Sequence, residues 1–380
     1  MKKNLSLYIH MPFCERKCEY CGFNSKVGTD QEKAIYVKDL FTEIKMRAKE
    51  YAEYFSVDSI FFGGGTPSFM PANTIRDVLS YIYRYFSVKN DAEITVEVNP
   101  NTITNAKIRE YIISGVNRFS IGLQTTNEKI LKAMGRTHTV QDFDNAIERI
   151  RDQGVSNINA DLIIGYPGQT EKDVENAVKH LISLKIPHVS CYMLQVEEGT
   201  KLYKRVKAGL ENVVPDDKVI KMYNKMLSIL RANGYARYEF SNFAKPGFQC
   251  THNQTYWDRN DYLGFGVSAH SYVSGVRFSN TDNVQLYHER LSQEKLATEI
   301  ANELSKEEKQ EEFVMLALRT EKGLNTKDYE KEFGENFLSK NKNKLAVLIK
   351  GGFVTLSPEG VIKATDKGFL VLNRIIYELI

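Results

Sequence analysis

Three of the five cysteines fall in one short loop near the start of the sequence, at Cys14, Cys18 and Cys21. Clustered thiols are typical of soft-metal ligation, whereas a disulfide framework spreads and pairs its cysteines. The C-x3-C-x2-C spacing fits two kinds of metal site. Zinc would need a fourth ligand, and His10 is the only nearby candidate. A [4Fe–4S] cluster would use the three thiolates and leave one iron open to a further ligand.

Further groups that could bind a ligand follow the expected strands. The run Gly63–Gly65, just before Thr66, would let backbone N–H and C=O groups approach a ligand closely, although a plain tight turn has the same sequence. Glu97, Gln124 and Asp161 stand on the next three expected strands, near their ends. Each alone fits a structural role, but polar groups on four consecutive strands indicate a shared site at one end of a barrel.

A repeating strand–helix pattern would position these groups. Short β-branched runs alternate with amphipathic helical stretches from residue 5 to about residue 195, which predicts parallel strands with right-handed crossovers. Helix N-caps are expected at Thr104, Thr139 and Thr170, and helix ends at Gly115 and Gly154. The expected strands are Leu5–His10, Val57–Gly63, Ala92–Val98, Arg118–Gln124, Asn157–Gly165 and His188–Gln195.

One face of these strands is polar. In the third strand Thr95, Glu97 and Asn99 alternate with apolar residues, and the fourth and fifth strands alternate in the same way. Strands that are covered on both faces read as nearly continuous apolar runs. The polar face therefore predicts a concave interior suited to a ligand, while the apolar faces meet the outer helices.

The rest of the chain shows two other sequence patterns. A long helix is expected over residues 215–232, followed by a Gly- and aromatic-rich stretch to about residue 278. From about residue 298, helical segments lead to two β-like segments and a closing helix. We therefore expect an α/β protein with three parts: a partial (β/α)6 barrel over residues 1–235, a smaller α+β extension over residues 236–297, and a winged-helix-like unit over residues 298–380.

Composition narrows the class of protein. The 380 residues are 42% hydrophobic and 26% charged, with a net charge of +3, as in an ordinary globular protein. Near-neutral charge argues against a nucleic-acid partner, so we interpret the C-terminal lysines as a solvated or protein-contact face. These are Lys340, Lys342, Lys344 and Lys350. No apolar stretch is long enough for a signal peptide or a transmembrane helix, which predicts a cytoplasmic protein.

The cysteine loop resembles that of the radical S-adenosylmethionine (SAM) superfamily, in which C-x3-C-x2-C follows the first barrel strand. The resemblance implies a barrel of the radical SAM type, in which Cys14, Cys18 and Cys21 hold a [4Fe–4S] cluster and the open iron binds SAM. One electron from the cluster can cleave the sulfonium of SAM, and this chemistry belongs to the cofactor while the protein supplies its position.

Motifs along nearly the whole chain are similar to those of the oxygen-independent coproporphyrinogen III dehydrogenase family. They occupy residues 8–25, 63–68, 97–100, 118–124, 134–138 and 161–167. The resemblance implies that SAM is contacted by Tyr8, Tyr20, Gly64, Gly65, Thr66, Glu97, Gln124, Arg136 and Asp161, with Met193 and His270 as further cofactor-lining positions. Carboxylates would bind the ammonium or ribose hydroxyls, and Arg136 would bind the methionine carboxylate.

Two departures place the chain nearer the haem-chaperone branch of that family. The dehydrogenases carry a fourth cysteine where this chain has Phe23, and they carry more sequence before the first strand. The branch is marked by His-Asn-x-x-Tyr-Trp, present here from His252 to Trp257. The resemblance implies that His252 is an axial haem ligand beside Tyr256 and Trp257. Residue types alone also fit a hydrogen-bonded histidine beside an aromatic plug.

Two functions of different class follow from the resemblance. A haem chaperone would bind haem, the cluster and SAM, and would pass haem to acceptors such as respiratory enzymes or ferritins, with transient contact to membrane proteins. A radical enzyme would decarboxylate coproporphyrinogen III oxidatively, an activity that the missing cysteine disfavours. A radical enzyme that modifies nucleic acid is a weaker third hypothesis.

Of the other cysteines, Cys250 is near the haem motif and Cys191 is expected in the core.

Overall fold

The computed structural model describes residues 2–380. Within that part of the chain twelve strands form one sheet, and its central six run parallel in sequence order. They are β1 (Lys3–Met11), β2 (Phe55–Gly64), β3 (Ser87–Val98), β4 (Arg118–Gln124), β5 (Ile158–Ile164) and β6 (His188–Met193). Each overlaps its predicted strand, and the architecture confirms the partial (β/α)6 barrel.

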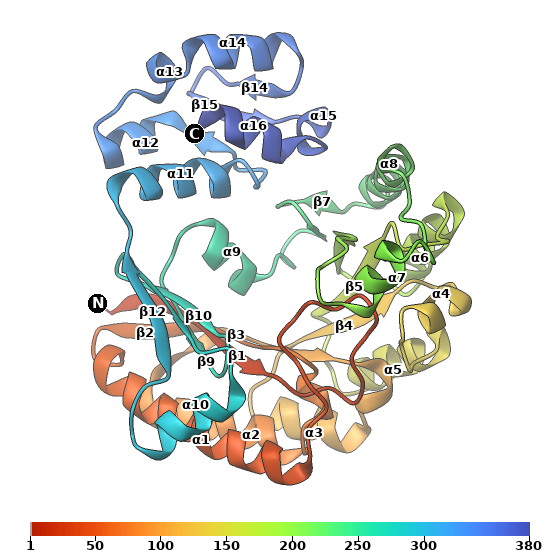
Figure 1. The fold of residues 1–380 in the computed structure, drawn as a ribbon, viewed down its shortest axis with the longest axis vertical. Helices are drawn as coiled ribbons and strands as arrows, with labels where there is room; N and C mark the ends of the chain where they lie inside the picture. Colours follow the sequence, from red (N-terminus) through yellow and green to blue (C-terminus); the bar gives the residue numbers. More distant parts are fainter. Residues whose placement is uncertain (1) are drawn as a thin grey trace.

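Helices cover one face of this sheet (Figure 1). They are α1 (Asp30–Tyr51), α2 (Asn73–Tyr85), α3 (Asn105–Ile113), α4 (Glu128–Ala133), α5 (Val140–Asp152) and α6 (Glu171–Ser183), with short 3-10 turns at Pro67–Phe69 and Pro100–Thr102. The hydroxyls of Thr104, Thr139 and Thr170 cap α3, α5 and α6 as predicted, because each accepts an otherwise unpaired backbone N–H. None of the helices within residues 2–380 has both the length and the apolar character needed to cross a membrane.

The two faces of the sheet differ in polarity. Ile94, Val96 and Val98 of β3 belong to the large hydrophobic core beneath the outer helices. Since successive side chains of a strand point to opposite faces, Thr95 and Glu97 lie on the inner face. The hydrophobic effect therefore fixes the apolar face against the helices and leaves the polar face inside the barrel, as the alternation predicts.

The chain after β6 extends the sheet at both edges. After α7 (Lys201–Lys207) and α8 (Asp216–Ala232), β8 (Asn242–Ala244) pairs with β6 and carries β7 (Ala236–Arg237) beside it. On the other edge β9 (Tyr262–Phe265) pairs with β1. Outside it lie β10 (His270–Val273), β11 (Val276–Asn280) and β12 (Thr298–Glu303), with α10 (Val284–Ser292) before β12. The edges of the parallel core are thereby paired.

The C-terminal unit has its own hydrophobic core and a three-stranded sheet in the order β13-β15-β14. Its elements are α11 (Lys306–Ala317), β13 (Leu324–Asn325), α12 (Thr326–Phe333), α13 (Phe337–Lys340), α14 (Lys342–Lys350), β14 (Val354–Leu356), β15 (Val361–Ala364), α15 (Asp366–Phe369) and α16 (Leu372–Leu379). Helices followed by a small hairpin agree with a winged-helix-like unit. The predicted boundaries at residues 235 and 298 stay predictions, and β12 pairs with the large sheet.

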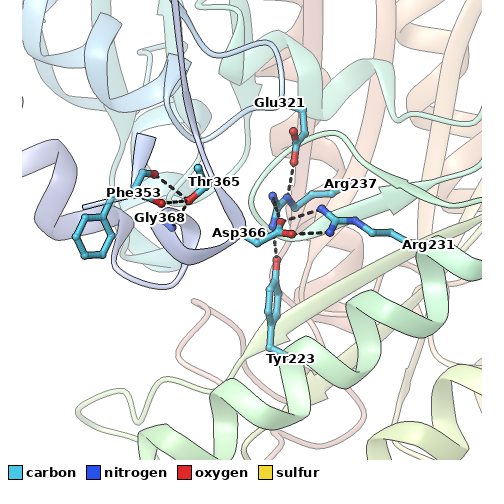
Figure 2. A network of polar contacts seen from close by, with 9 residues as sticks. Tyr223, Arg231, Arg237, Glu321, Phe353, Thr365, Asp366 and Gly368 are labelled. Atoms are coloured by element: carbon cyan, nitrogen blue, oxygen red, sulfur yellow. Dashed lines mark hydrogen bonds and ion pairs between the residues drawn. The ribbon is translucent and has the colours of Figure 1, made fainter. Parts of the chain in front are cut away.

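A buried arginine joins this unit to the barrel (Figure 2). The side chain of Arg237, at the end of β7, is 2% exposed and pairs with Glu321 and Asp366 at 2.7 and 3.0 Å. Its third N–H group donates to the hydroxyl of Tyr223 on α8 at 3.0 Å. Arg231 of α8 also binds both carboxylate oxygens of Asp366. The network holds the C-terminal unit against α8 and the edge of the sheet.

Candidate cofactor and ligand site

The three clustered cysteines lie in the loop that follows β1, at the C-terminal ends of the parallel strands. Backbone hydrogen bonds close this loop, from Cys14 N to Lys26 O at 2.9 Å and from Lys26 N to Pro12 O at 2.8 Å. All three cysteines are free thiols. Burial raises the pKa of Cys14 and Cys21, and the nearby thiols raise it further. Burial therefore favours the neutral thiols of Cys14 and Cys21, and a bound metal centre would stabilise the thiolate forms.

His10 is not arranged as a fourth metal ligand. Its Nδ1 lies 3.1 Å from the hydroxyl of Tyr8, and its Nε2 lies 2.9 Å from the backbone oxygen of Asn24. Within residues 2–380, no three histidine, cysteine or carboxylate side chains converge as the ligands of a single ion do. With His10 engaged elsewhere, the three-cysteine donor set fits a four-iron cluster, which takes three thiolates and leaves one iron open, better than a zinc site that needs four ligands.

The glycine run packs directly on the cysteine loop. Gly65 N donates to Met11 O at 2.8 Å, and Thr66 N donates to Phe13 O at 2.9 Å. The Thr66 hydroxyl lies 3.5 Å from Cys14 Sγ. A Cβ at Gly65 would lie only 2.7 Å from the oxygen of Met11, so no larger residue fits there without displacing the loop. The glycines thus allow the close approach of two backbones at the site.

Arg136 connects the cysteine loop with two strand ends. Its Nη1 lies 3.7 Å from Cys18 Sγ, and its Nη2 donates to Asn99 Oδ1 at 2.5 Å and to Gly122 O at 3.1 Å. A Cβ at Gly122 would lie 2.9 Å from Nη2. The glycine therefore makes room for the guanidinium, which is held in a fixed orientation beside the thiols.

Two acidic side chains, Glu97 and Asp161, interact electrostatically on the inner face of the sheet. Burial, followed by the charge of Asp161, raises the pKa of Glu97 to about 8. Burial also raises the pKa of Asp161, which accepts a hydrogen bond from Asn159 at 2.7 Å. Gln124 ends β4 with a positive φ of 69°, a conformation that costs a non-glycine residue of order 1 kcal/mol and that recurs at ligand sites. Such carboxyl groups are suited to a ligand that carries positive charge.

The inner face of the parallel strands borders the space that we call the lumen. Tyr192, the inward residue near the end of β6, has 44% of its surface exposed, yet burial raises its pKa well above the usual range. Tyr192 alternates with the core residue Cys191, so its side chain lies on the inner face that borders the lumen. The negative charges of Asp161 and Glu97 raise the same pKa, so all three residues face the lumen.

The His-Asn-x-x-Tyr-Trp motif forms α9 (Thr251–Trp257), which lies between the sheet and the C-terminal unit in Figure 1. His252 is 1% exposed, and its ring stacks on Phe61 with centroids 5.1 Å apart. Its Nδ1 lies 2.9 Å from the Ser59 hydroxyl, and its Nε2 lies 2.9 Å from the Tyr256 hydroxyl. The centroid of the Tyr8 ring is 6.5 Å from that of His252. The motif therefore packs on the inner face of the sheet, slightly nearer the N-terminal ends of the strands than Tyr8. Trp257 is partly buried.

The remaining predicted positions are more scattered. Tyr20 packs edge-on against Tyr166, with ring centroids 6.4 Å apart. Met193 is partly buried at the end of β6, and His270 is exposed at the start of β10. Cys191 belongs to the hydrophobic core, as predicted. Cys250 donates to the Glu93 carboxylate at 3.2 Å.

Comparisons with known proteins agree with this geometry. The profile of the Radical SAM superfamily matches residues 8–181, and that of the HemN C-terminal domain matches residues 304–371. The chain is 36% identical over 375 residues to the haem chaperone HemW of Lactococcus lactis, which spans 99% of this chain and 97% of that protein. It is 37% identical over 272 residues to the HemW of Escherichia coli, covering 71% of this chain and 70% of that protein.

The chain belongs to the HemW family of the radical SAM superfamily. Among solved structures, coproporphyrinogen III oxidase (HemN) of E. coli superimposes with a TM-score of 0.89 at 24% identity, over 100% of this chain and 90% of HemN. That likeness shows the shared fold. Membership of the superfamily implies a [4Fe–4S] cluster and SAM.

Three residues of this site were not among the site residues predicted from the sequence. Asn99 orients Arg136, Tyr192 lines the lumen, and Arg118 starts β4 on the inner face. Asn99 and Arg118 stand two residues from Glu97 and Ser120 on the polar faces of their strands, and Tyr192 directly follows Cys191, which was expected in the core. The alternation along each strand was therefore a usable signal for them.

Proposed function

We propose that this chain binds haem and delivers it to acceptor proteins, and that it carries a [4Fe–4S] cluster on Cys14, Cys18 and Cys21 with SAM beside it. One observation carries the proposal. A relative 36% identical over 99% of this chain is named a haem chaperone, and here the cysteine loop and the motif of that branch face the same barrel interior.

The residues around the cysteine loop fit the cofactors. When bound, the cluster supplies an open iron and one electron for cleavage of the SAM sulfonium. Arg136 would bind the SAM carboxylate, and Glu97 and Asp161 would bind its cationic or hydroxyl groups. The other proposed contacts are Tyr8, Tyr20, Gly64, Gly65, Thr66, Gln124, Met193 and His270. The chain's own role is to orient SAM and to exclude water from it.

His252 has the protonation state that haem ligation needs. Burial, followed by the charge of Arg118, lowers the pKa of His252 to about 3, so the ring is neutral at pH 7 and offers a lone pair. For Nε2 to reach haem iron, the Tyr256 hydroxyl that now faces it has to turn away. Tyr256 and Trp257 would then contact the macrocycle as aromatic neighbours.

A haem titration tests this proposal. Wild-type protein should give a saturable Soret band with added haem, and His252→Ala should weaken haem binding at least tenfold without loss of iron–sulfur absorbance. His180→Ala is the matched control, since His180 lies outside the barrel on α6, where it pairs with Asp144. An identical titration for wild type and His252→Ala would exclude His252 as the ligand.

Haem transfer and decarboxylation separate the two functional hypotheses. We expect the haem-loaded protein to reconstitute a haem-free respiratory enzyme or ferritin, and to release no carbon dioxide from coproporphyrinogen III under anaerobic reducing conditions with SAM. Phe23, which replaces the fourth cysteine of the dehydrogenases, is 69% exposed on the cysteine loop. Carbon dioxide release would establish the enzyme instead. We place this activity in the cytoplasm, with only transient contact to membrane-bound acceptors.

A further inference from the structure

One buried arginine of the barrel has no partner. Arg118 is 1% exposed at the start of β4, and its Nε is fully buried without a hydrogen bond. None of the side-chain hydrogen bonds or ion pairs within residues 2–380 involves its guanidinium; burial lowers its pKa, but nearby negative groups that include Glu93 and Asp161 raise it overall. Burying a guanidinium without a partner costs several kcal/mol. A charged group that stays buried despite this free-energy cost is a candidate for ligand binding.

Other arginines with a buried Nε show that this is unusual. Three more have an unpaired, buried Nε, but each directs another N–H group to a neighbouring oxygen. The contacts are Arg47 to Thr298 at 2.6 Å, Arg277 to Tyr262 at 3.1 Å and Arg319 to Asn373 at 2.9 Å. Arg118 alone among these four leaves the whole guanidinium free.

Register places Arg118 on the wall of the lumen. It pairs with Thr95, while Ser120 pairs with Glu97. Arg118 therefore lies on the same face as Glu97 but two residues, or about 7 Å, nearer the N-terminal ends of the strands. Its charge contributes to the lowered pKa of His252. The guanidinium is thus close to the histidine that we propose as the haem ligand.

Polar neighbours of Arg118 are already engaged elsewhere. Glu93 accepts hydrogen bonds from Cys250 Sγ and from the backbone N–H groups of Thr251 and His252, at 3.2, 3.1 and 3.1 Å. It therefore binds the start of α9 with both oxygens. Asn159 Oδ1 accepts from Ser190 and lies 2.6 Å from His188 Nδ1. Glu93 and Asp161 act on Arg118 through their charge and not through a hydrogen bond, so its N–H groups are available to an incoming anion.

We propose that Arg118 binds a propionate carboxylate of haem inside the lumen, below the SAM site. The inference rests on the proposed function, because it assigns the orientation of the same cargo. Haem combines an apolar ring with carboxylates on one edge. The lumen wall offers Tyr8, Phe61 and Tyr256 to an aromatic ring, and a guanidinium is the side chain that binds a carboxylate with two parallel hydrogen bonds.

The test compares haem with its dimethyl ester, which has the same ring but no carboxylate. Wild-type protein should bind haem at least tenfold more tightly than the ester. Arg118→Met should bind both with about the affinity that wild type has for the ester, and Arg118→Lys should retain part of the preference. Affinity for SAM, measured by calorimetry, should not change. Arg47→Met, which alters a buried arginine of α1 on the outer face, should keep the wild-type preference.

The outcomes separate this inference from the proposed function. Wild type that binds no haem would refute the proposed function itself. Wild type that binds haem and ester equally, or Arg118→Met that keeps the preference, would overturn the role of Arg118 alone. So would loss of SAM affinity with haem affinity intact. Since a ligand group is unpaired in free protein, Arg118→Met without haem should melt no lower than wild type, and a fall of several degrees would show a structural arginine instead.

Discussion

The guanidinium of Arg136 lies 3.7 Å from the sulfur of Cys18. The same guanidinium is fixed by Asn99 and the backbone of Gly122, so a bound anion would meet a donor that is already oriented. Lysine keeps the positive charge but cannot make these contacts together. We expect Arg136→Lys to weaken SAM binding about tenfold, or about 1.4 kcal/mol, as measured by calorimetry under anaerobic conditions.

Iron content provides the control for this variant. Arg136→Lys should retain the iron and sulfide of wild type, because its contact with Cys18 is a hydrogen bond and not a metal bond. Arg16→Lys, at an exposed position of the cysteine loop, should bind SAM as wild type does. If Arg136→Lys bound SAM with wild-type affinity, the carboxylate of SAM would have to be held elsewhere.

Each of Cys14, Cys18 and Cys21 is expected to be necessary for the cluster. Replacing any one with serine should abolish the broad absorbance near 400 nm after anaerobic reconstitution and should lower iron and sulfide to background. Cys191→Ser and Cys250→Ser are matched controls, since both residues are buried away from the loop. Full iron and sulfide in a Cys14, Cys18 or Cys21 variant would refute the ligand set.

The raised pKa of Glu97 predicts how stability changes with pH. In the folded protein Glu97 holds its proton up to about pH 8, whereas the unfolded carboxyl releases it near pH 4.5. Folding therefore binds a proton between these values, and the contribution of Glu97 to the free energy of unfolding falls as pH rises through this window and levels off above it. Chemical denaturation without SAM should show a smaller fall for Glu97→Gln than for wild type.

Glu148→Gln is the control for that measurement, because Glu148 is exposed on α5. It should leave the pH dependence of the unfolding free energy unchanged. The same slope for Glu97→Gln and wild type between pH 5 and 8 would show that the Glu97 carboxyl is solvated in the folded protein, and that the lumen does not raise its pKa.

Local patterns were enough to predict the barrel and one end of its site. The alternation Thr95, Glu97 and Asn99 identified the inner face, and threonine caps identified helix starts, because both depend on near neighbours in sequence. The position of His252 depends on a contact with Ser59, 193 residues away. No local pattern encodes that contact, so the burial of α9 against β1 and β2 could not be predicted. The binding roles of these residues stay predictions.

The pairing of the sheet edges also could not be predicted from the sequence. The stretch after residue 235 reads as a smaller α+β extension because it is rich in Gly and aromatic residues and differs from the strand–helix pattern before it, and this pattern does not say where its strands pair. Its strands join both edges of the parallel sheet, through β8 and β9. Edge pairing is driven by the unpaired N–H and C=O groups of β1 and β6, which every strand carries regardless of its side chains. Composition therefore could not reveal it.

The network around Arg237 predicts how firmly the C-terminal unit is held (Figure 2). Besides its bonds to Glu321, Asp366 and Tyr223, the guanidinium lies 3.5 Å from the ring centroid of Phe369 in the C-terminal unit. The contacts with Glu321, Asp366 and Phe369 span the junction with the barrel, and the contact with Tyr223 holds the guanidinium on the barrel side. Removing the buried guanidinium leaves Glu321 without its partner, whereas Asp366 keeps its pair with Arg231, and both carboxylates remain partly exposed to water.

Arg237→Met should therefore destabilise this junction by about 1.5–3 kcal/mol, because it removes the buried charged hydrogen bonds and the contact with the Phe369 ring. The expected signs are faster proteolysis within residues 298–306, before the C-terminal unit, and a separate early unfolding transition in calorimetry. Arg231→Met is the matched control, because its pair with Asp366 is nearly half exposed on both sides and such pairs contribute about 1 kcal/mol or less. Equal effects of the two variants, or a single unchanged transition for Arg237→Met, would show that apolar packing of the two units, and not the buried guanidinium, holds the junction together.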